Sequence, residues 1–145
     1  MPHYILVCDK GTILPSLKES RWGVKEKNIS KLNLLSIEDT IFIYIKGQSP
    51  LGKGAICGPF YVSQTSHNPD GGFYQEKNYS KIIEFSQESN VSYIEFKDTV
   101  QEISLVKNKE HWGMIFMGRA IIAINQEDSD SISSRIREKG YPVRS

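Results

Sequence analysis

This sequence has almost no charge imbalance. Eighteen Lys and Arg residues stand against seventeen Asp and Glu residues, which gives a formal net charge of +1. A protein that binds nucleic acid along a wide surface needs a clear basic excess to contact many phosphates. The near-neutral balance therefore argues against such a surface, but it permits recognition of one nucleotide in a pocket, where few charges are needed.

Cysteines and long apolar runs are also scarce. Cys8 and Cys57 both lie in apolar, β-like stretches, where we expect small buried thiols. The two cysteines and three histidines do not cluster as zinc ligands do, so we expect no metal site. No run reaches transmembrane length, and the N-terminal run is too short, and lacks the basic flank, for a signal peptide. We therefore expect a cytoplasmic protein without a membrane partner or a cofactor.

The sequence contains no recognisable catalytic motif. Residues 47–54 nearly match a phosphate-binding loop, but Gly54 stands where Ser or Thr is needed for magnesium, and the following segment is β-like. We interpret this stretch as a hairpin loop. There is no Gly-x-Ser-x-Gly motif, the histidines are scattered, and Cys8 has no identifiable activating base. We expect that the protein is not an enzyme.

Short strands and short helices follow one another without regular βαβ alternation, which excludes a doubly wound sheet. The length suits a single domain over residues 1–145. We predict an α+β fold, a mixed β-barrel with flanking short helices. The predicted strands cover residues 4–7, 41–45, 55–62, 79–85 and 91–96, and a turn at 87–90 joins the last two. Helical spacing is found at 12–19, 28–35 and 98–106, and a terminal helix is capped by Asn125 and Asp128. Residues 63–72 are rich in turns.

Aromatic residues beside glycines are the strongest functional signal. Trp22 precedes Gly23, and Phe73 and Tyr74 follow two glycines, so both sets place rings beside flexible backbone, in positions predicted to lie outside strand interiors. Two interpretations remain open for them: the walls of a ligand cage, or rings that close the ends of a barrel. For Trp112, between a charged loop and an apolar run, we favour a place in the core.

Several blocks of this chain resemble the EVE domain, a member of the PUA-like superfamily beside the YTH and ASCH domains. The resemblance is to the stand-alone archaeal and bacterial proteins, and it covers nearly the whole chain in order. The blocks are Tyr4–Cys8, Ser20–Val24 with Lys31, Ser36–Thr40 running into Ile43 and Tyr44, Gly58–Ser63, and Phe96 through Lys107–Phe116 to Gly118 and Arg119.

The resemblance implies a PUA-like β-barrel that binds RNA or DNA carrying a modified base, which is turned out of the stack into an aromatic pocket. Residues just after the first strand differ from the YTH pattern, so the identity of the base is not carried over. The implied site consists of Trp22 as one wall with Gly23 beside it, Phe73 or Tyr74 as the second aromatic, Asp9 and Lys10 near the base edge, and Lys107 and Lys109 as nucleic-acid contacts.

We therefore expect a non-catalytic reader of a modified base. Two alternatives are a protein-interaction module, in which the rings would contact a partner chain, and an enzyme that modifies nucleic acid. The resemblance chooses neither RNA nor DNA. We expect a monomer or a weak homodimer, since an edge strand near Pro59 would permit pairing between copies.

Overall fold

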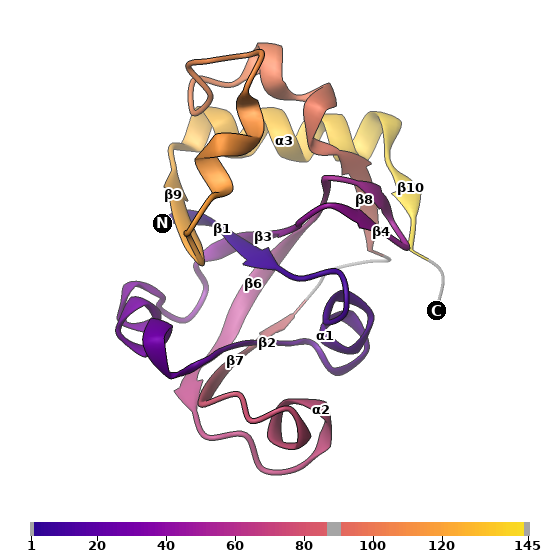
Figure 1. Ribbon diagram of the computed structural model, residues 1–145. Coiled ribbons are helices and arrows are strands. Elements are labelled where there is room, and N and C mark those ends of the chain that lie inside the picture. Colours follow the sequence, from indigo (N-terminus) through magenta and orange to yellow (C-terminus); the bar gives the residue numbers. More distant parts are fainter. Residues whose placement is uncertain (1, 87–90, 144–145) are drawn as a thin grey trace.

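An open mixed sheet forms the centre of the protein in the computed structural model, which describes residues 2–86 and 91–143 (Figure 1). Its strand order is β10-β8-β6-β3-β1-β9, with β7 paired to β6 and β2 paired to β7. The strands are β1 (His3–Cys8), β2 (Arg21–Val24), β3 (Thr40–Ile45), β6 (Ala55–His67), β7 (Lys81–Ser86), β8 (Ser92–Glu95), β9 (Ile121–Ile124) and β10 (Tyr141–Pro142). A separate hairpin of β4 (Gln48–Ser49) and β5 (Gly52–Lys53) confirms the predicted hairpin loop at 47–54.

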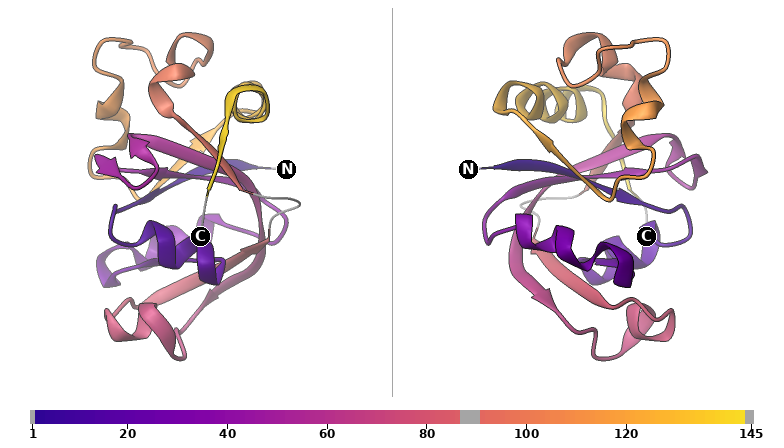
Figure 2. Two further views of the ribbon diagram at one scale, coloured as in Figure 1. Left: turned by 90° about the vertical axis from the view of Figure 1, so that its right-hand side faces the viewer. Right: turned by 60° about the vertical axis from the view of Figure 1, so that its left-hand side comes forward.

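Helices lie on both sides of the β1–β3 layer (Figure 2). On one side lie α3 and the segment from η2 to η4, and on the other side lie α1, η1 and the β2–β7 pair with α2 beneath it. The α-helices are α1 (Ile13–Glu19), α2 (Gly72–Glu76) and α3 (Gln126–Lys139), and the 3₁₀ helices are η1 (Glu26–Leu34), η2 (Phe96–Asp98), η3 (Val100–Glu102) and η4 (Trp112–Phe116).

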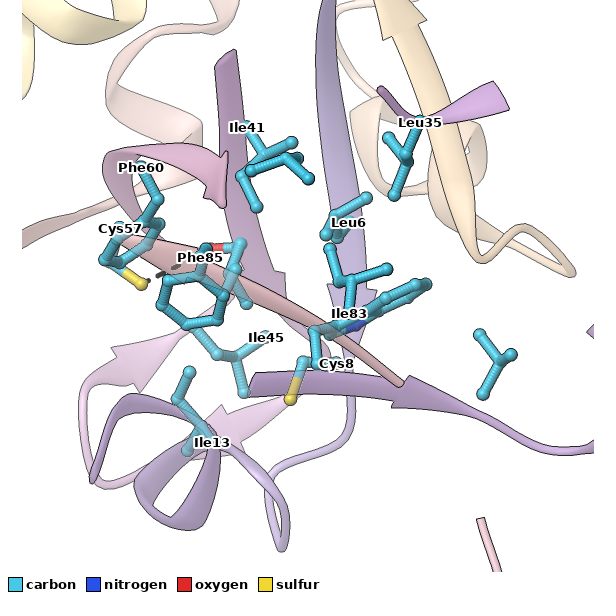
Figure 3. Close-up of a cluster of buried hydrophobic side chains, with 14 of the residues drawn as sticks. Leu6, Cys8, Ile13, Leu35, Ile41, Ile45, Cys57, Phe60, Ile83 and Phe85 are labelled. Atoms are coloured by element: carbon cyan, nitrogen blue, oxygen red, sulfur yellow. Dashed lines mark hydrogen bonds between the residues drawn. The ribbon is translucent and has the colours of Figure 1, made fainter. Parts of the chain in front are cut away.

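The two faces of β3 belong to two separate apolar clusters. Ile41, Ile43 and Ile45 point into the cluster shared with β1, β6, β7 and α1, which Figure 3 shows. Phe42 and Tyr44 point into the cluster beneath α3. Side chains alternate between faces along a strand, so a strand covered on both faces must be apolar throughout. This explains the continuous apolar run that marks β3 in the sequence.

The sheet is open, so the predicted barrel is wrong. Within the described residues β2 pairs only with β7, and β9 pairs only with β1, so these two ends do not meet. The strand β6 is irregular here: its register with β7 shifts twice, between Val62 and Gln64 and between Gln64 and His67. Such irregularities bend a strand and increase its twist. The bend takes β7 and β2 beneath the β1–β3 layer, as Figure 1 shows, and no further strand bridges β2 and β9 within the described residues.

The same long strand corrects two further expectations. Residues 63–67, predicted as part of a turn-rich stretch, continue β6. The segments 79–85 and 91–96 do form β7 and β8, but both pair with β6 at different points along it and not with each other. The turn predicted at 87–90 lies outside the described residues. Pro59 lies inside β6 where the register with β3 shifts, between the pairs Cys57–Ile43 and Phe60–Ile41, so the bulge that a proline within a strand suggests is present there.

Local helix signals had mixed outcomes. The terminal helix is confirmed as α3, and the Asn125 side chain accepts from the Asp128 N–H at 2.8 Å. The Asp128 carboxylate does not complete a capping box; it accepts instead from the N–H groups of Ser104 and Leu105, at 2.9 and 2.8 Å. The helical spacing at 98–106 yields only the last residue of η2 and the single turn of η3, between buried apolar residues. The strand β9 was not predicted.

Candidate functional site

A cavity of about 280 Å³ opens on the side of the sheet where β2 and β9 do not meet. Its lining comes from the end of β1, the start of α1, β2 and the start of η1, the residue after β3, the segment from α2 to β7, and the turn that leads into β9. These segments are far apart in the sequence, and the folded sheet brings them together.

Trp22 is one of the residues that line this cavity. Trp22 lies within β2, opposite Ile83 of β7, so the expectation that it lies outside a strand is wrong. Its Nε1–H donates to the Val7 main-chain oxygen at 3.2 Å, which fixes the ring plane against the end of β1. The side chain is 2% exposed and belongs to the core. Trp22 is therefore a cavity wall and a packing residue at once.

Gly23 allows the ring of Tyr74 to pack directly against β2. A Cβ atom added to Gly23 would lie 2.7 Å from Cδ1 of Tyr74, closer than side chains approach one another. The Tyr74 hydroxyl donates to the Arg21 main-chain oxygen at 2.9 Å and hydrogen-bonds to Ser16 Oγ. Burial raises the pKa of Tyr74 above its ordinary value. Tyr74 is thus held rigidly as a second wall of the cavity.

Within the described residues, the edge of β2 that faces away from β7 pairs with no other strand. The Ser20 oxygen accepts from the Phe85 N–H at 3.0 Å on the β7 side, whereas the Arg21 oxygen accepts from the Tyr74 hydroxyl on the other side. Backbone groups alternate between the two edges of a strand. By this alternation the N–H and C=O of Gly23 face away from β7, and Gly23 lines the cavity. One donor and one acceptor therefore lie side by side at the wall.

Tyr79 is a third aromatic residue of the lining, and the sequence did not single it out. Its ring centroid lies 4.9 Å from that of Tyr74 at an interplanar angle of 68°. Lys25 Nζ lies 4.2 Å from the centroid of the Tyr79 ring, a cation–π contact at the cavity rim. Tyr79 was predicted to begin a strand, but β7 begins two residues later, and no local pattern marks its ring as part of a site.

A thiol and a hydroxyl meet at the end of β1. Cys8 Sγ lies 2.8 Å from Thr12 Oγ1, and Thr12 Oγ1 donates to the Asp9 main-chain oxygen at 2.9 Å. Burial raises the pKa of Cys8 to about 11. The thiol is therefore protonated at neutral pH, and a protonated thiol is a poor nucleophile. Cys8 and Cys57 are both buried and unpaired, as predicted.

The rim of the cavity is positively charged although the whole chain is nearly neutral. Four cations lie among its lining residues, against the single carboxylate of Asp9: Lys25, Lys27, Lys46 and Arg119. Asp9 lies 3.5 Å from Lys46 Nζ, and both side chains are largely exposed. A local excess of one sign at a cavity mouth concentrates ions of the opposite sign there. The rim is therefore suited to an anionic ligand.

The structure brings together only part of the site predicted from the sequence. Asp9, Trp22, Gly23 and Tyr74 line the cavity. Phe73 packs edge-on against the Tyr74 ring and, like Lys10, is not among the lining residues. Lys107 is exposed and also does not line it. Lys109 donates through Nζ to the oxygens of Val100 and Ile103, at 2.7 and 2.8 Å, so its ammonium group is engaged within its own loop.

Metal-binding clusters and membrane-spanning helices were sought among the described residues. Across 2–86 and 91–143, no three His, Cys, Asp or Glu side chains gather closely enough to hold a metal ion. Of the helices within the same ranges, none has the length and apolar character needed to cross a membrane.

Known proteins with a similar sequence or fold were found for this chain. No family model matches the chain. The UPF0310 protein of Pyrococcus abyssi is 20% identical over 140 residues, which cover 92% of this chain and 99% of the relative. The YTH domain of Zygosaccharomyces rouxii MRB1, solved in complex with N6-methyladenosine RNA, has a TM-score of 0.63 and 13% identity, covering 93% of this chain and 87% of that one.

A second solved structure is similar over almost the same length. Human THYN1, in complex with DNA that contains 5-methylcytosine, has a TM-score of 0.59 and 14% identity, covering 98% of this chain and 100% of that one. At these identities the likeness shows a shared fold, that of the YTH and THYN1 structures. Membership of the EVE domain family stays a prediction.

Proposed function

We propose that this protein binds RNA or DNA and takes one modified base from the strand into the cavity between Trp22, Tyr74 and Tyr79, without catalysing a reaction on it. The observation that carries the proposal is the cavity itself, which combines aromatic walls, an unpaired strand edge and a ring of cations. The fold it shares with structures solved on methylated RNA and DNA supports the same conclusion.

The size and walls of the cavity suit a single base. A volume of about 280 Å³ lies at the lower end of small-molecule sites, which span roughly 300–1,000 Å³. Stacking of a base on an aromatic side chain contributes about 1–3 kcal/mol. Tyr79 is partly buried and has ring surface available for such stacking, whereas Trp22 and Tyr74, 2% and 1% exposed, are rigid core residues of the lining.

The unpaired edge of β2 provides the means to distinguish one base from another. The N–H and C=O of Gly23 suit a base edge that carries one acceptor beside one donor. A base with the wrong pattern leaves these buried groups unpaired, at a cost of about 1–3 kcal/mol. Burial of one extra methyl group contributes only about 0.8 kcal/mol. Recognition of the base edge should therefore outweigh recognition of the methyl group alone.

The four rim cations set both the strength of binding and the preferred form of nucleic acid. Lys25 already donates to the Lys77 main-chain oxygen and Lys46 lies 3.5 Å from Asp9, so the rim can neutralise only a few phosphates, and affinity should be modest and should fall with salt. Extraction of a base from a duplex costs a few kcal/mol, and this cost is smallest in single strands. We expect single-stranded or weakly paired ligands to bind best.

The chemistry of the cavity favours binding over catalysis. The Cys8 thiol is protonated because of its burial, and Thr12 already donates to a main-chain oxygen. Tyr74 is likewise held in its neutral form, by burial and by its hydrogen bonds to Ser16 and Arg21. These groups stabilise the walls of the cavity and do not supply an activated nucleophile.

A fluorescence titration tests the proposal. The chain has two tryptophans, so Trp112→Phe leaves Trp22 as the only indole reporter. We expect its emission to be quenched by short single strands that carry one particular modified base, and much less by the unmodified strand. Titration at several salt concentrations should show a weaker interaction as salt rises.

The matched variant is Trp22→Phe, which keeps Trp112 as the reporter outside the cavity lining. We expect no quenching of Trp112 and a clear loss of affinity in a filter or anisotropy assay. If no modified strand binds, the proposal is wrong. A change in mass of the oligonucleotide after incubation would support a modifying enzyme, and stable capture of one protein without any nucleic-acid binding would support an interaction module.

A further inference from the structure

Two exposed methionines lie in the segment that leads to the cavity. Met114 and Met117 are 64% and 71% exposed, within and just after η4. Gly118 and Arg119 follow directly and line the cavity. Consecutive Cα atoms are about 3.8 Å apart, so the backbone of Met117 stands at the cavity rim. The Met117 N–H donates to the Met114 oxygen at 3.2 Å, which keeps the two methionines on one turn.

The segment that carries these methionines is anchored from below. Phe116 is buried, and its ring stacks on Tyr44 with centroids 3.6 Å apart and planes 6° from parallel. Trp112, at the start of η4, packs against Phe96 at 5.6 Å. Phe116 and Trp112 therefore anchor η4 to the core, whereas Met114 and Met117 do not take part in this packing.

The surroundings of the methionines indicate what covers them. Arg119 follows Met117 at the rim, so the apolar pair has a positive charge two residues away. Nucleic acid presents apolar base faces next to negative phosphates, which matches this combination. Methionine side chains pack well against aromatic faces and are used as apolar wedges between bases. Met117 is also bonded directly to Gly118, which lines the proposed base-binding cavity.

We propose that Met117, supported by Met114, packs against the nucleobase that neighbours the base held in the cavity. This inference rests on the proposed function. Once a base leaves the stack, the face of its neighbour is exposed to water, and an apolar side chain at the rim covers that face. The methionines thereby stabilise the extruded arrangement of the strand without contacting the modified base itself.

The test compares two ligands and two variants. The first ligand is a short single strand with the modified base that the wild-type protein binds, and the second has abasic nucleotides on both sides of that base. Met117→Ser should weaken binding of the first ligand about two- to tenfold, the range expected for contacts between a methionine and an aromatic ring. It should leave binding of the second ligand unchanged.

Ile37→Ala is the matched control. Ile37 is 59% exposed, but it precedes β3, whereas the cavity lies at the far end of that strand beside Lys46. This control should bind both ligands as the wild-type protein does. Because Met117 is exposed, its variant should also unfold at the same denaturant concentration as the wild type.

The possible outcomes separate this inference from the function it rests on. If the wild-type protein binds no modified strand, the proposed function fails. If the wild type binds but Met117→Ser loses nothing, or loses equally on both ligands, only the role of the methionines is refuted. A dimer in sedimentation experiments that Met117→Ser abolishes would make the pair a contact between two copies, and would also overturn the proposal.

Discussion

The indole nitrogen of Trp22 and the main-chain oxygen of Val7 are joined by a hydrogen bond of 3.2 Å across the open side of the sheet. No backbone ladder is present between β2 and β1 within the described strands, so this side-chain bond links the two layers there. The cavity lies against this link. The same residue therefore connects the layers and lines the cavity.

Trp22→Ala should destabilise the protein by about 3–5 kcal/mol, because a large buried side chain is removed. Trp22→Phe keeps most of the packing but leaves the Val7 oxygen unpaired, so we expect a loss of about 1–3 kcal/mol. Urea unfolding followed by circular dichroism measures both. Equal stability of Trp22→Ala and the wild type would contradict the structural role assigned to this ring.

Gly23→Ala should disturb Tyr74, since the added Cβ lies 2.7 Å from its ring. Overpacking of this kind costs about 1–3 kcal/mol, and displacement of Tyr74 should also weaken ligand binding. Gly11→Ala is a suitable control, because a Cβ there meets nothing within 4 Å. The control should unfold and bind as the wild type does, and a similar loss in both variants would argue against the specific contact.

Cys8 should make stability depend on alkaline pH. Burial raises its pKa from 9.0 to about 11, so between these values the unfolded chain loses the thiol proton while the folded protein retains it. The unfolded state then binds fewer protons, and the free energy of unfolding falls as pH rises from about 9 to 11. The contribution is intact below pH 9 and is lost by the time the pH passes 11.

Cys8→Ala isolates this contribution from other groups that titrate in the same range. The variant lacks the thiol, so its free energy of unfolding should decline less steeply between pH 9 and 11 than that of the wild type. Parallel curves for the two proteins, measured by urea unfolding at each pH, would show that Cys8 does not titrate as its burial requires.

Arg119→Gln should reduce the salt dependence of binding. Each phosphate contact that a single strand makes contributes about −0.7 to the slope of log affinity against log salt. Loss of one rim cation should therefore make the slope shallower by about that amount and weaken binding at low salt. Arg137→Gln, an exposed position on α3, is the control and should leave the slope unchanged. An equal effect of both variants would indicate attraction by net charge alone.

Local patterns in the sequence predicted much of the secondary structure. The apolar run of β3, the hairpin at 47–54 and the Asn125 cap of α3 depend on neighbours within a few residues, and all three are confirmed. The pairing of β7 and β8 was predicted wrongly, because both pair with β6, and the length and bends of that strand follow from tertiary packing.

The sequence by itself determined that aromatic residues beside glycines are the distinctive feature of this chain, because ring and glycine are adjacent in Trp22–Gly23. Only the tertiary structure decided which rings share a cavity: it includes Tyr79, leaves Phe73 out of the lining, and engages Lys109 inside its loop. The reason is physical. A hydrophobic pattern shows which face of an element is buried, but a cavity is formed by segments far apart in the chain. Their distance depends on how an open sheet bends.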